Sequence, residues 1–314
     1  MENTNKEYRI ERLHFSRLKD LDTLYEAVYG HASPKNFFQK KYDTAYTGKS
    51  CIGYVAYNKE NIPVAYYGVI PCFVQYKNKI ILSAQSGDTM THPLFRYKGM
   101  FVELSKITFD LCKAEDIPFI FGFPNQNSYH GAVHKLGWIM TEQMESFTIP
   151  VHALPLKSFS ERFNWTKFFY KQYAKFILKK YFLQQHGLPN SITAEGFGGI
   201  YRDEKYLQYK TYSNTQVIKI GNAKVWFKIT SDFIIGDIEL GDFDFDELIN
   251  ELKKISKYLG LSKIIFQTSS GTHLHSLFAE RFKSFPSFPV LFQNFGTDIS
   301  LSEIKFAFAD IDIF

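Results

Sequence analysis

The sequence is poor in the residues that build disulfide frameworks and thiolate metal sites. Its 314 residues include three cysteines, Cys51, Cys72 and Cys112, which lie far apart and outside any CxxC pair. An odd number of widely spaced cysteines favours neither a disulfide scaffold nor a zinc site. We therefore expect all three to be small apolar residues of the core.

Long hydrophobic runs and targeting patterns are missing as well. The first residues, MENTNKEYRIER, are polar from the start, unlike the charged and then apolar order of a signal peptide. No apolar run approaches the roughly 20 residues that a membrane-spanning helix needs. These features predict a cytoplasmic protein.

Motifs of several large enzyme classes are also absent. The chain contains no P-loop, no GxGxxG after a strand and no GxSxG elbow. His130 and His134 are spaced as in zinc proteases, but Gly131 stands where those enzymes carry a glutamate. The pair His273 and His275 is a weak signal by itself. We therefore expect no metal cofactor.

The net charge of +5 and the pI near 8.8 are too mild to indicate a nucleic-acid partner. The composition is 45% hydrophobic and 18% aromatic, which allows enough apolar burial to offset the entropy of ordering. The length suits two ordinary domains.

Hydrophobic periodicity through residue 150 predicts the element order β-α-α-β-β-β-α-β-α-β-β, including a helix at 33–46 and a pair of strands at the end. Residues 201–314 show a similar pattern of strands and helices, closing on a strand, FAFADIDIF. We therefore predict domains at 1–150 and 201–314, joined by a helical insert and linker at 151–200.

That insert contains a long amphipathic helix, predicted over 158–186. Trp165, Phe169, Tyr173 and Phe176 follow one stripe, and Lys167, Lys171, Lys175 and Lys179 follow another at i,i+4 spacing. We expect the aromatic stripe to pack on a domain. The lysines then face either solvent or an anionic surface such as a membrane.

The segment from Thr91 to Phe101 lies between a predicted strand and a predicted helix. N–H groups that open a helix lack intrahelical partners and carry the positive end of its dipole, so they favour anions. Gly99 allows close backbone approach, and Arg96 and Lys98 add cationic donors suited to phosphates.

This segment resembles the pyrophosphate loop of the GNAT superfamily of N-acetyltransferases, in which an Arg or Gln, two variable residues and a Gly open a helix. Phe101 departs from the usual Gly or Ala at its position. The resemblance implies acetyl-CoA as the co-substrate. The residues that it places against CoA here are Arg96, Tyr97, Lys98, Gly99, Met100 and Phe101.

A second part of the resemblance covers residues 121–129 and the later Lys135-Leu136-Gly137-Trp138. It implies a buried strand that leads into polar residues facing CoA, here Asn125 and Asn127. The family's usual tyrosine acid is replaced by Val133. Tyr129 or His134 would then protonate the departing thiolate, unless each has only a packing or capping role.

Acyl transfer to an amine requires removal of a proton from the amine and polarisation of the thioester carbonyl. The resemblance places the polarising N–H groups near Thr89, Met90 and Thr91. Asp88 lies on the same predicted strand and, unlike Gln85, can titrate. Asp88 is therefore the candidate base, with a solvated or substrate-orienting carboxylate as the alternative.

The resemblance implies an α/β (α+β) fold: a mixed, mostly antiparallel sheet flanked by helices, followed by a smaller, degenerate lobe of similar layout. The loop GDFDFD in the second half is acidic where a pyrophosphate site needs donors, so we expect one CoA site. In the similar Eis-like acetyltransferases the chain terminus reaches the active site, a role open here to Asp310 or the Phe314 carboxylate.

The expected function is transfer of an acetyl group from acetyl-CoA to a small-molecule amine such as an amino sugar. Two alternatives remain open. One is a transferase similar to the FemABX family, which uses aminoacyl-tRNA, and the other is a non-catalytic binding or scaffold protein.

Overall fold

The computed structural model describes residues 7–160 and 163–314. The chain divides into two compact units. Unit 1 is built from the chain up to Thr141 and from Pro289–Leu301, and unit 2 from Glu142–Phe288 and Ser302–Phe314. This division differs from the expected boundaries at 150 and 200.

Unit 1 contains a sheet in the order β1-β2-β3-β4-β5-β13. All neighbouring strands pair antiparallel except β4 and β5, which run parallel. The bounds are β1 Tyr8–Arg12, β2 Ile52–Asn58, β3 Pro63–Tyr76, β4 Lys79–Thr91, β5 Phe119–Gly122 and β13 Ser284–Asn294.

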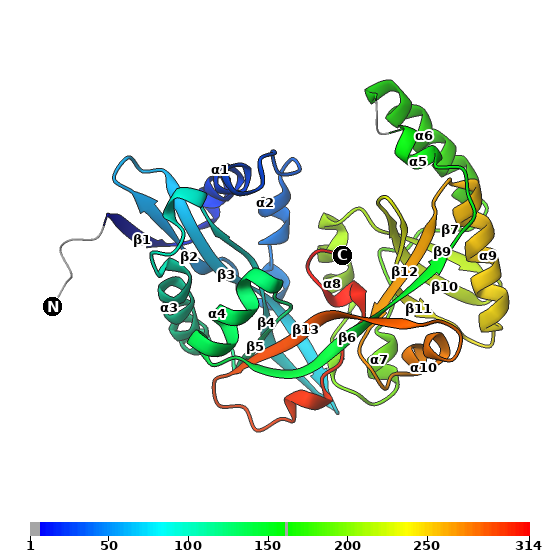
Figure 1. Ribbon diagram of the computed structural model, residues 1–314. Helices are drawn as coiled ribbons and strands as arrows, with labels where there is room; N and C mark the ends of the chain where they lie inside the picture. Colours follow the sequence, from blue (N-terminus) through cyan, green and yellow to red (C-terminus); the bar gives the residue numbers. More distant parts are fainter. Residues whose placement is uncertain (1–6, 161–162) are drawn as a thin grey trace. The chain divides into compact units, whose positions relative to one another are not determined.

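Helices cover both faces of this sheet (Figure 1). Successive residues of a strand point to opposite faces. Tyr66 contacts Tyr42 at the end of α2, whereas Tyr67 contacts Phe101 in α3. Helices α1 and α2 therefore cover one face, and α3 and α4 cover the other. The bounds are α1 Leu18–Tyr29, α2 Phe37–Lys41, α3 Met100–Ala114 and α4 Gln126–Leu136.

Unit 2 contains the remaining strands of this order, β6-β12-β11-β10-β9-β7, in which β11 and β12 are the parallel pair. Its strands are β6 Ile139–Pro150, β7 Phe182–Leu183, β9 Gln216–Ile220, β10 Ala223–Ile229, β11 Phe233–Glu239 and β12 Lys263–Thr268, with the short β8 Gly199–Ile200 outside this order. Its helices are α5 Leu156–Ser160, α6 Asn164–Leu178, α7 Ser191–Ala194, α8 Glu204–Tyr209, α9 Phe245–Tyr258 and α10 His273–Ala279.

The two units repeat one plan. Three antiparallel strands, a helix, a parallel strand and a helix follow one another as β2-β3-β4-α3-β5-α4 in unit 1 and as β9-β10-β11-α9-β12-α10 in unit 2. The strand that follows each repeat pairs with the sheet strands of the other repeat. Strand β6, which follows α4, pairs with β12, and Leu291–Asn294 of β13, which follows α10, pair with β5. The predicted mixed sheet with a second lobe of similar layout is confirmed.

Several local expectations are wrong. Residues 139–150 form one continuous strand, because β6 pairs with β12 rather than with a neighbour in sequence. The helix at 33–46 is reduced to α2 and a short 3-10 turn. The closing segment is not a strand, since Phe308–Asp310 form a 3-10 turn in which the Asp310 carboxylate accepts from the Ala307 N–H.

The long helix predicted over 158–186 begins and ends differently. Residues 161–162 of the predicted span lie outside the described residues, and α6 ends at Leu178. The expected packing of its aromatic stripe is also wrong, because Trp165, Phe169 and Phe176 are 65%, 63% and 74% exposed. Helix α6 packs on unit 2 through Ala174, Ile177 and Leu178 instead.

The three cysteines are free and buried, as predicted. Burial raises the pKa of the Cys112 thiol to about 12, so that thiol stays protonated at neutral pH. Among the described residues, no group of three or more His, Cys, Asp or Glu is placed to hold a metal ion. Within the same residues, no helix combines the length and the apolar character needed to cross a membrane.

Candidate active site

Strands β4 and β5 of unit 1 separate partway along β4. Their parallel ladder joins Ala84 to Ile120 and ends where Ser86 meets Gly122. Strand β4 continues to Thr91, whereas β5 ends at Gly122. The last residues of β4, which include the candidates Thr89, Met90 and Thr91, therefore lie beyond the part of β4 that pairs with β5.

A β-bulge distorts β4 directly after this separation. Tyr66 pairs with Met90 and Gly68 with Gly87, so Asp88 and Thr89 together face the single residue Tyr67. Asp88 adopts a left-handed backbone with φ of 53°. Non-glycine residues adopt this conformation at a cost of roughly 1–2 kcal/mol, and such strain is concentrated at functional sites.

Two residues at the end of α2 hold the Asp88 carboxylate. The buried Lys41 ammonium lies 2.7 Å from Oδ2, and the Tyr42 hydroxyl donates to the same oxygen over 3.1 Å. Sequence reasoning missed Lys41 and Tyr42, because more than 40 residues separate them from Asp88. The available signal was the position of Lys41, which follows Phe38 at i+3 and therefore lies on the buried face of α2.

Among residues 7–160 and 163–314, no side chain caps the N–H groups that begin helix α3. Gly99 precedes it in the left-handed conformation, with φ of 78°, and offers no side-chain acceptor. Met100 and Phe101 open the helix, where backbone N–H groups have no intrahelical acceptor. Tyr97 is also left-handed, with φ of 65°, and is fully exposed, so no packing contact accounts for its strain.

The two predicted cationic residues of this loop differ in their surroundings. The Lys98 ammonium donates to the Glu7 carboxylate over 2.5 Å. Arg96 is exposed, and in residues 7–160 and 163–314 its guanidinium makes no hydrogen bond or ion pair. Arg96 is therefore the cation that remains available to a bound anion.

The side chain of Phe101 is partly buried. Its ring contacts Tyr67 and packs against α4, where a Cβ on Gly131 would lie 2.8 Å from the ring. The glycine of α4 thus makes room for the bulky residue of α3.

Helix α4 receives a side-chain cap. The Asn125 side chain accepts from the N–H groups of Asn127 and Ser128. Tyr129 is half-buried in the second turn, and its hydroxyl contacts the Met140 sulfur at 3.4 Å. His134 lies exposed near the other end of α4, with its ring 4.6 Å from that of His130. The helix therefore separates Tyr129 from His134 by about 7.5 Å along its axis.

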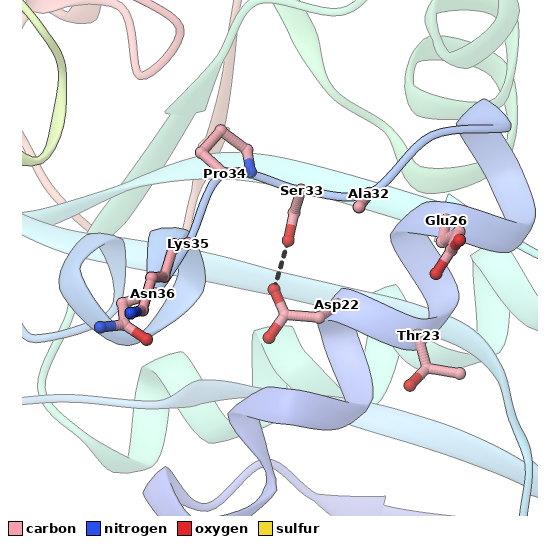
Figure 2. A pocket seen from close by; sticks show the side chains of 8 residues that line it. All are labelled: Asp22, Thr23, Glu26, Ala32, Ser33, Pro34, Lys35 and Asn36. Atoms are coloured by element: carbon pink, nitrogen blue, oxygen red, sulfur yellow. Dashed lines mark hydrogen bonds between the residues drawn. The ribbon is translucent and has the colours of Figure 1, made fainter.

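A pocket of about 260 Å³ lies between α1 and the segment before α2. Figure 2 shows that Asp22, Thr23 and Glu26 line it from α1, opposite residues 32–36. Asp22 accepts a hydrogen bond of 2.5 Å from the Ser33 hydroxyl. Two carboxylates, Asp22 and Glu26, and one ammonium group, Lys35, line this pocket, so its lining carries one net negative charge.

The corresponding helix start in unit 2 lacks these features. Asp244 caps α9 by accepting from the Glu247 N–H, and Asp246 and Glu247 occupy its first turn. The capped N–H group and the acidic side chains disfavour a phosphate there.

Asp310 of unit 2 is bound to Arg202, and the Phe314 ring is buried against Trp226.

No protein-family model and no curated protein sequence matches the chain. Solved structures do match it. A protein of Enterococcus faecalis described as a probable N-acyltransferase gives a TM-score of 0.60 at 13% identity, covering 92% of this chain and 73% of that one. A GCN5-related N-acetyltransferase of Kribbella flavida gives 0.57 at 10% identity, with coverages of 92% and 72%.

The N-myristoyltransferase of Saccharomyces cerevisiae, solved with myristoyl-CoA, gives a TM-score of 0.56 at 12% identity, covering 92% of this chain and 79% of that one. At such low identities these likenesses concern the fold. The chain has the fold of the GCN5-related N-acetyltransferases.

Proposed function

We propose that the chain is an acyltransferase that binds an acyl-CoA, with acetyl-CoA as the expected donor, and transfers the acyl group to an amine. The observation that carries the proposal is that two features lie next to each other in unit 1: the place where β4 separates from β5, and the uncapped start of α3. The β4–β5 ladder opens directly before the bulge at Asp88, and the chain then leads into the uncapped start of α3.

The start of α3 is proposed to hold the CoA pyrophosphate. The N–H groups that follow Gly99 and the positive end of the helix dipole attract the anion, and the guanidinium of Arg96 adds charge-assisted hydrogen bonds. The separated edge of β4 from Asp88 to Thr91 is proposed to hold the acyl end, with backbone N–H groups polarising the thioester carbonyl.

In the reaction, the amine nitrogen attacks the thioester carbon, the C–S bond breaks to release the CoA thiolate, and the amine proton passes to solvent water as the amide forms. Asp88 is proposed to orient the amine, because the Lys41 ammonium and the Tyr42 hydroxyl hold its carboxylate in place. Tyr129, in the second turn of α4, is the proposed acid for the thiolate. The exposed end of α4 makes His134 the weaker candidate.

The pocket lined by Asp22, Glu26 and Lys35, with one net negative charge, is a proposed docking place for the cationic acceptor. An amino sugar or another small amine suits its size and charge. The function is tested by thiol release from acetyl-CoA in the presence of a panel of amines. We expect release that depends on one class of amine, whereas no release above background with any amine would favour a binding protein.

Replacing Arg96 by Ala is expected to raise the KM for acetyl-CoA by about ten- to a hundred-fold and to leave kcat little changed. A charge-assisted hydrogen bond contributes about 1.5–3 kcal/mol, and CoA phosphates are remote from the reacting atoms. Lys98→Ala is the matched control, expected to have a smaller effect because Lys98 is paired with Glu7. Equal effects of both variants would contradict the assignment to Arg96.

Replacing Asp88 by Asn should lower kcat and spare the affinity for acetyl-CoA, since the carboxylate faces Lys41 and Tyr42 rather than the start of α3. Steady-state kinetics across pH separates the two roles of this residue. An orienting role predicts a lower kcat with an unchanged pH profile. If Asp88 is the base, the rise of kcat with pH that the parent shows should instead be lost in the variant.

A further inference from the structure

Helix α6 of unit 2 exposes an aromatic face that the fold does not use. This aromatic face consists of Phe163, just before the helix, and of Trp165, Phe168, Phe169 and Phe176, all at least 60% exposed. At 100° per residue the four helical members lie within about a third of the helix circumference. Burial in the protein therefore does not account for these side chains.

The opposite side of α6 is fixed to unit 2. Ala174, Ile177 and Leu178 pack against its core, and the Tyr170 hydroxyl donates to the Leu259 carbonyl over 2.9 Å. The Tyr173 hydroxyl donates to the Tyr258 carbonyl over 2.8 Å. The helix is therefore held with its aromatic face outward, and Figure 1 shows α5 and α6 extending past the end of α9.

Within the segment that carries α6, the charged side chains have a single sign, although Glu251 of α9 lies near Lys180. Lys167, Lys171, Lys175, Lys179 and Lys180 are all exposed, and the sequence contains no acidic residue from 162 to 194. Three of these lysines, at 171, 175 and 179, follow one line beside the aromatic face at i,i+4 spacing. A surface with aromatic side chains bordered by lysines complements a layer that is apolar inside and anionic outside.

We infer that α6 is a docking surface for an anionic lipid membrane, which unit 2 holds with the aromatic face toward the bilayer. The aromatic rings enter the interfacial region, where flat amphipathic rings are favoured, and the lysines meet the anionic headgroups. At 15 residues the helix is about 22 Å long, which suits a helix that lies in the plane of the interface. This inference is independent of the acyl-transfer proposal, because it uses no residue of unit 1.

The chain carries its own probe for this surface. It has three tryptophans, of which Trp138 and Trp226 are 5% and 0% exposed while Trp165 is 65% exposed. Transfer of Trp165 into lipid should therefore shift the emission to shorter wavelength, with little contribution from the other two. The experiment titrates the full chain with phosphatidylcholine vesicles that contain or lack phosphatidylglycerol, and measures both emission and co-sedimentation.

We expect binding with a blue shift on anionic vesicles and at least about tenfold weaker binding on vesicles of phosphatidylcholine alone. The variant K171Q/K175Q/K179Q should bind about a hundredfold more weakly, since each lysine near an anionic surface contributes roughly a fivefold factor. The matched control K19Q/K106Q/K135Q removes three exposed lysines elsewhere, with the same change in net charge, and should bind like the parent.

The aromatic contribution is measured with F168A/F169A/F176A, which retains Trp165 and should weaken binding by at least about tenfold. The control F15A/F182A/F285A removes three other exposed phenylalanines. No co-sedimentation with anionic vesicles would overturn the inference, as would binding without a shift of the Trp165 emission. Self-association that F168A/F169A/F176A abolishes, with no vesicle binding, would assign the face to a second copy of the chain instead.

Discussion

Replacing Gly99 by Asp should abolish acetyl-CoA binding while leaving the fold intact. Gly99 has a left-handed backbone, with φ of 78°, and nothing lies within 4 Å of the position that a Cβ would take. The new side chain therefore fits without a clash but places a negative charge beside the N–H groups proposed to meet the pyrophosphate. The Asp carboxylate would then repel the negatively charged pyrophosphate. At about 4 Å and an effective dielectric constant of about 20, the repulsion between two unit charges is about 4 kcal/mol, which lowers the affinity roughly a thousandfold.

Gly99→Asn is the matched control for this variant. Asn has nearly the same shape as Asp, tolerates the left-handed conformation and carries no charge. We expect Gly99→Asn to bind acetyl-CoA within about tenfold of the parent, because it shares the backbone strain but not the repulsion. If Gly99→Asp folds normally and binds like Gly99→Asn, the pyrophosphate does not lie at the start of α3.

The second large effect is expected in unit 2, at a buried ion cluster. The Arg202 guanidinium donates to Asp237 over 2.5 Å and to Asp310 over 2.8 Å, and all three side chains are fully buried. Arg202→Met leaves two buried carboxylates without their counter-charge, and breaking a buried ion pair costs about 3–5 kcal/mol. Urea unfolding followed by circular dichroism should show this loss. The exposed Arg281, replaced by Met, is the control and should leave the midpoint almost unchanged.

The loss in Arg202→Met should depend on pH. Burial raises the pKa of the Asp310 carboxyl, and the Arg202 charge opposes that rise. Without Arg202 the folded state holds a proton on Asp310 more readily than the unfolded state does. Folding then takes up a proton, so the variant should regain stability as the pH falls toward 5. A variant with parental stability at neutral pH would show that the cluster is not a structural centre of unit 2.

Local patterns were sufficient to predict the elements around the candidate site. The strand before Thr91, the loop from Arg96 to Gly99 and the following helix lie next to each other in sequence, and turn chemistry and periodicity depend on near neighbours. The sequence did not reveal the partners of Asp88, because the pairing with Lys41 depends on how α2 packs on the sheet. The fit of Phe101 depends likewise on a residue distant in sequence, because Gly131 of α4 leaves room for its ring.

Long-range pairing accounts for the other differences. The exchange of β6 and β13 joins strands about 120 to 170 residues apart, and no local pattern specifies such a partner. The predicted boundary was therefore placed at the end of β6, at residue 150, whereas the observed boundary between the units lies within that strand, after Thr141. For α6, amphipathicity indicated two distinct faces but not which one packs. The smaller residues Ala174, Ile177 and Leu178 allow close approach to the core and leave the large rings outside.

The most direct test of acyl-CoA binding by unit 1 is calorimetric titration of the full chain with acetyl-CoA. Unit 1 offers an uncapped start of α3, whereas the start of α9 in unit 2 is capped by Asp244 and acidic. We therefore expect one site per chain. A stoichiometry of two, or no measurable binding, would contradict it.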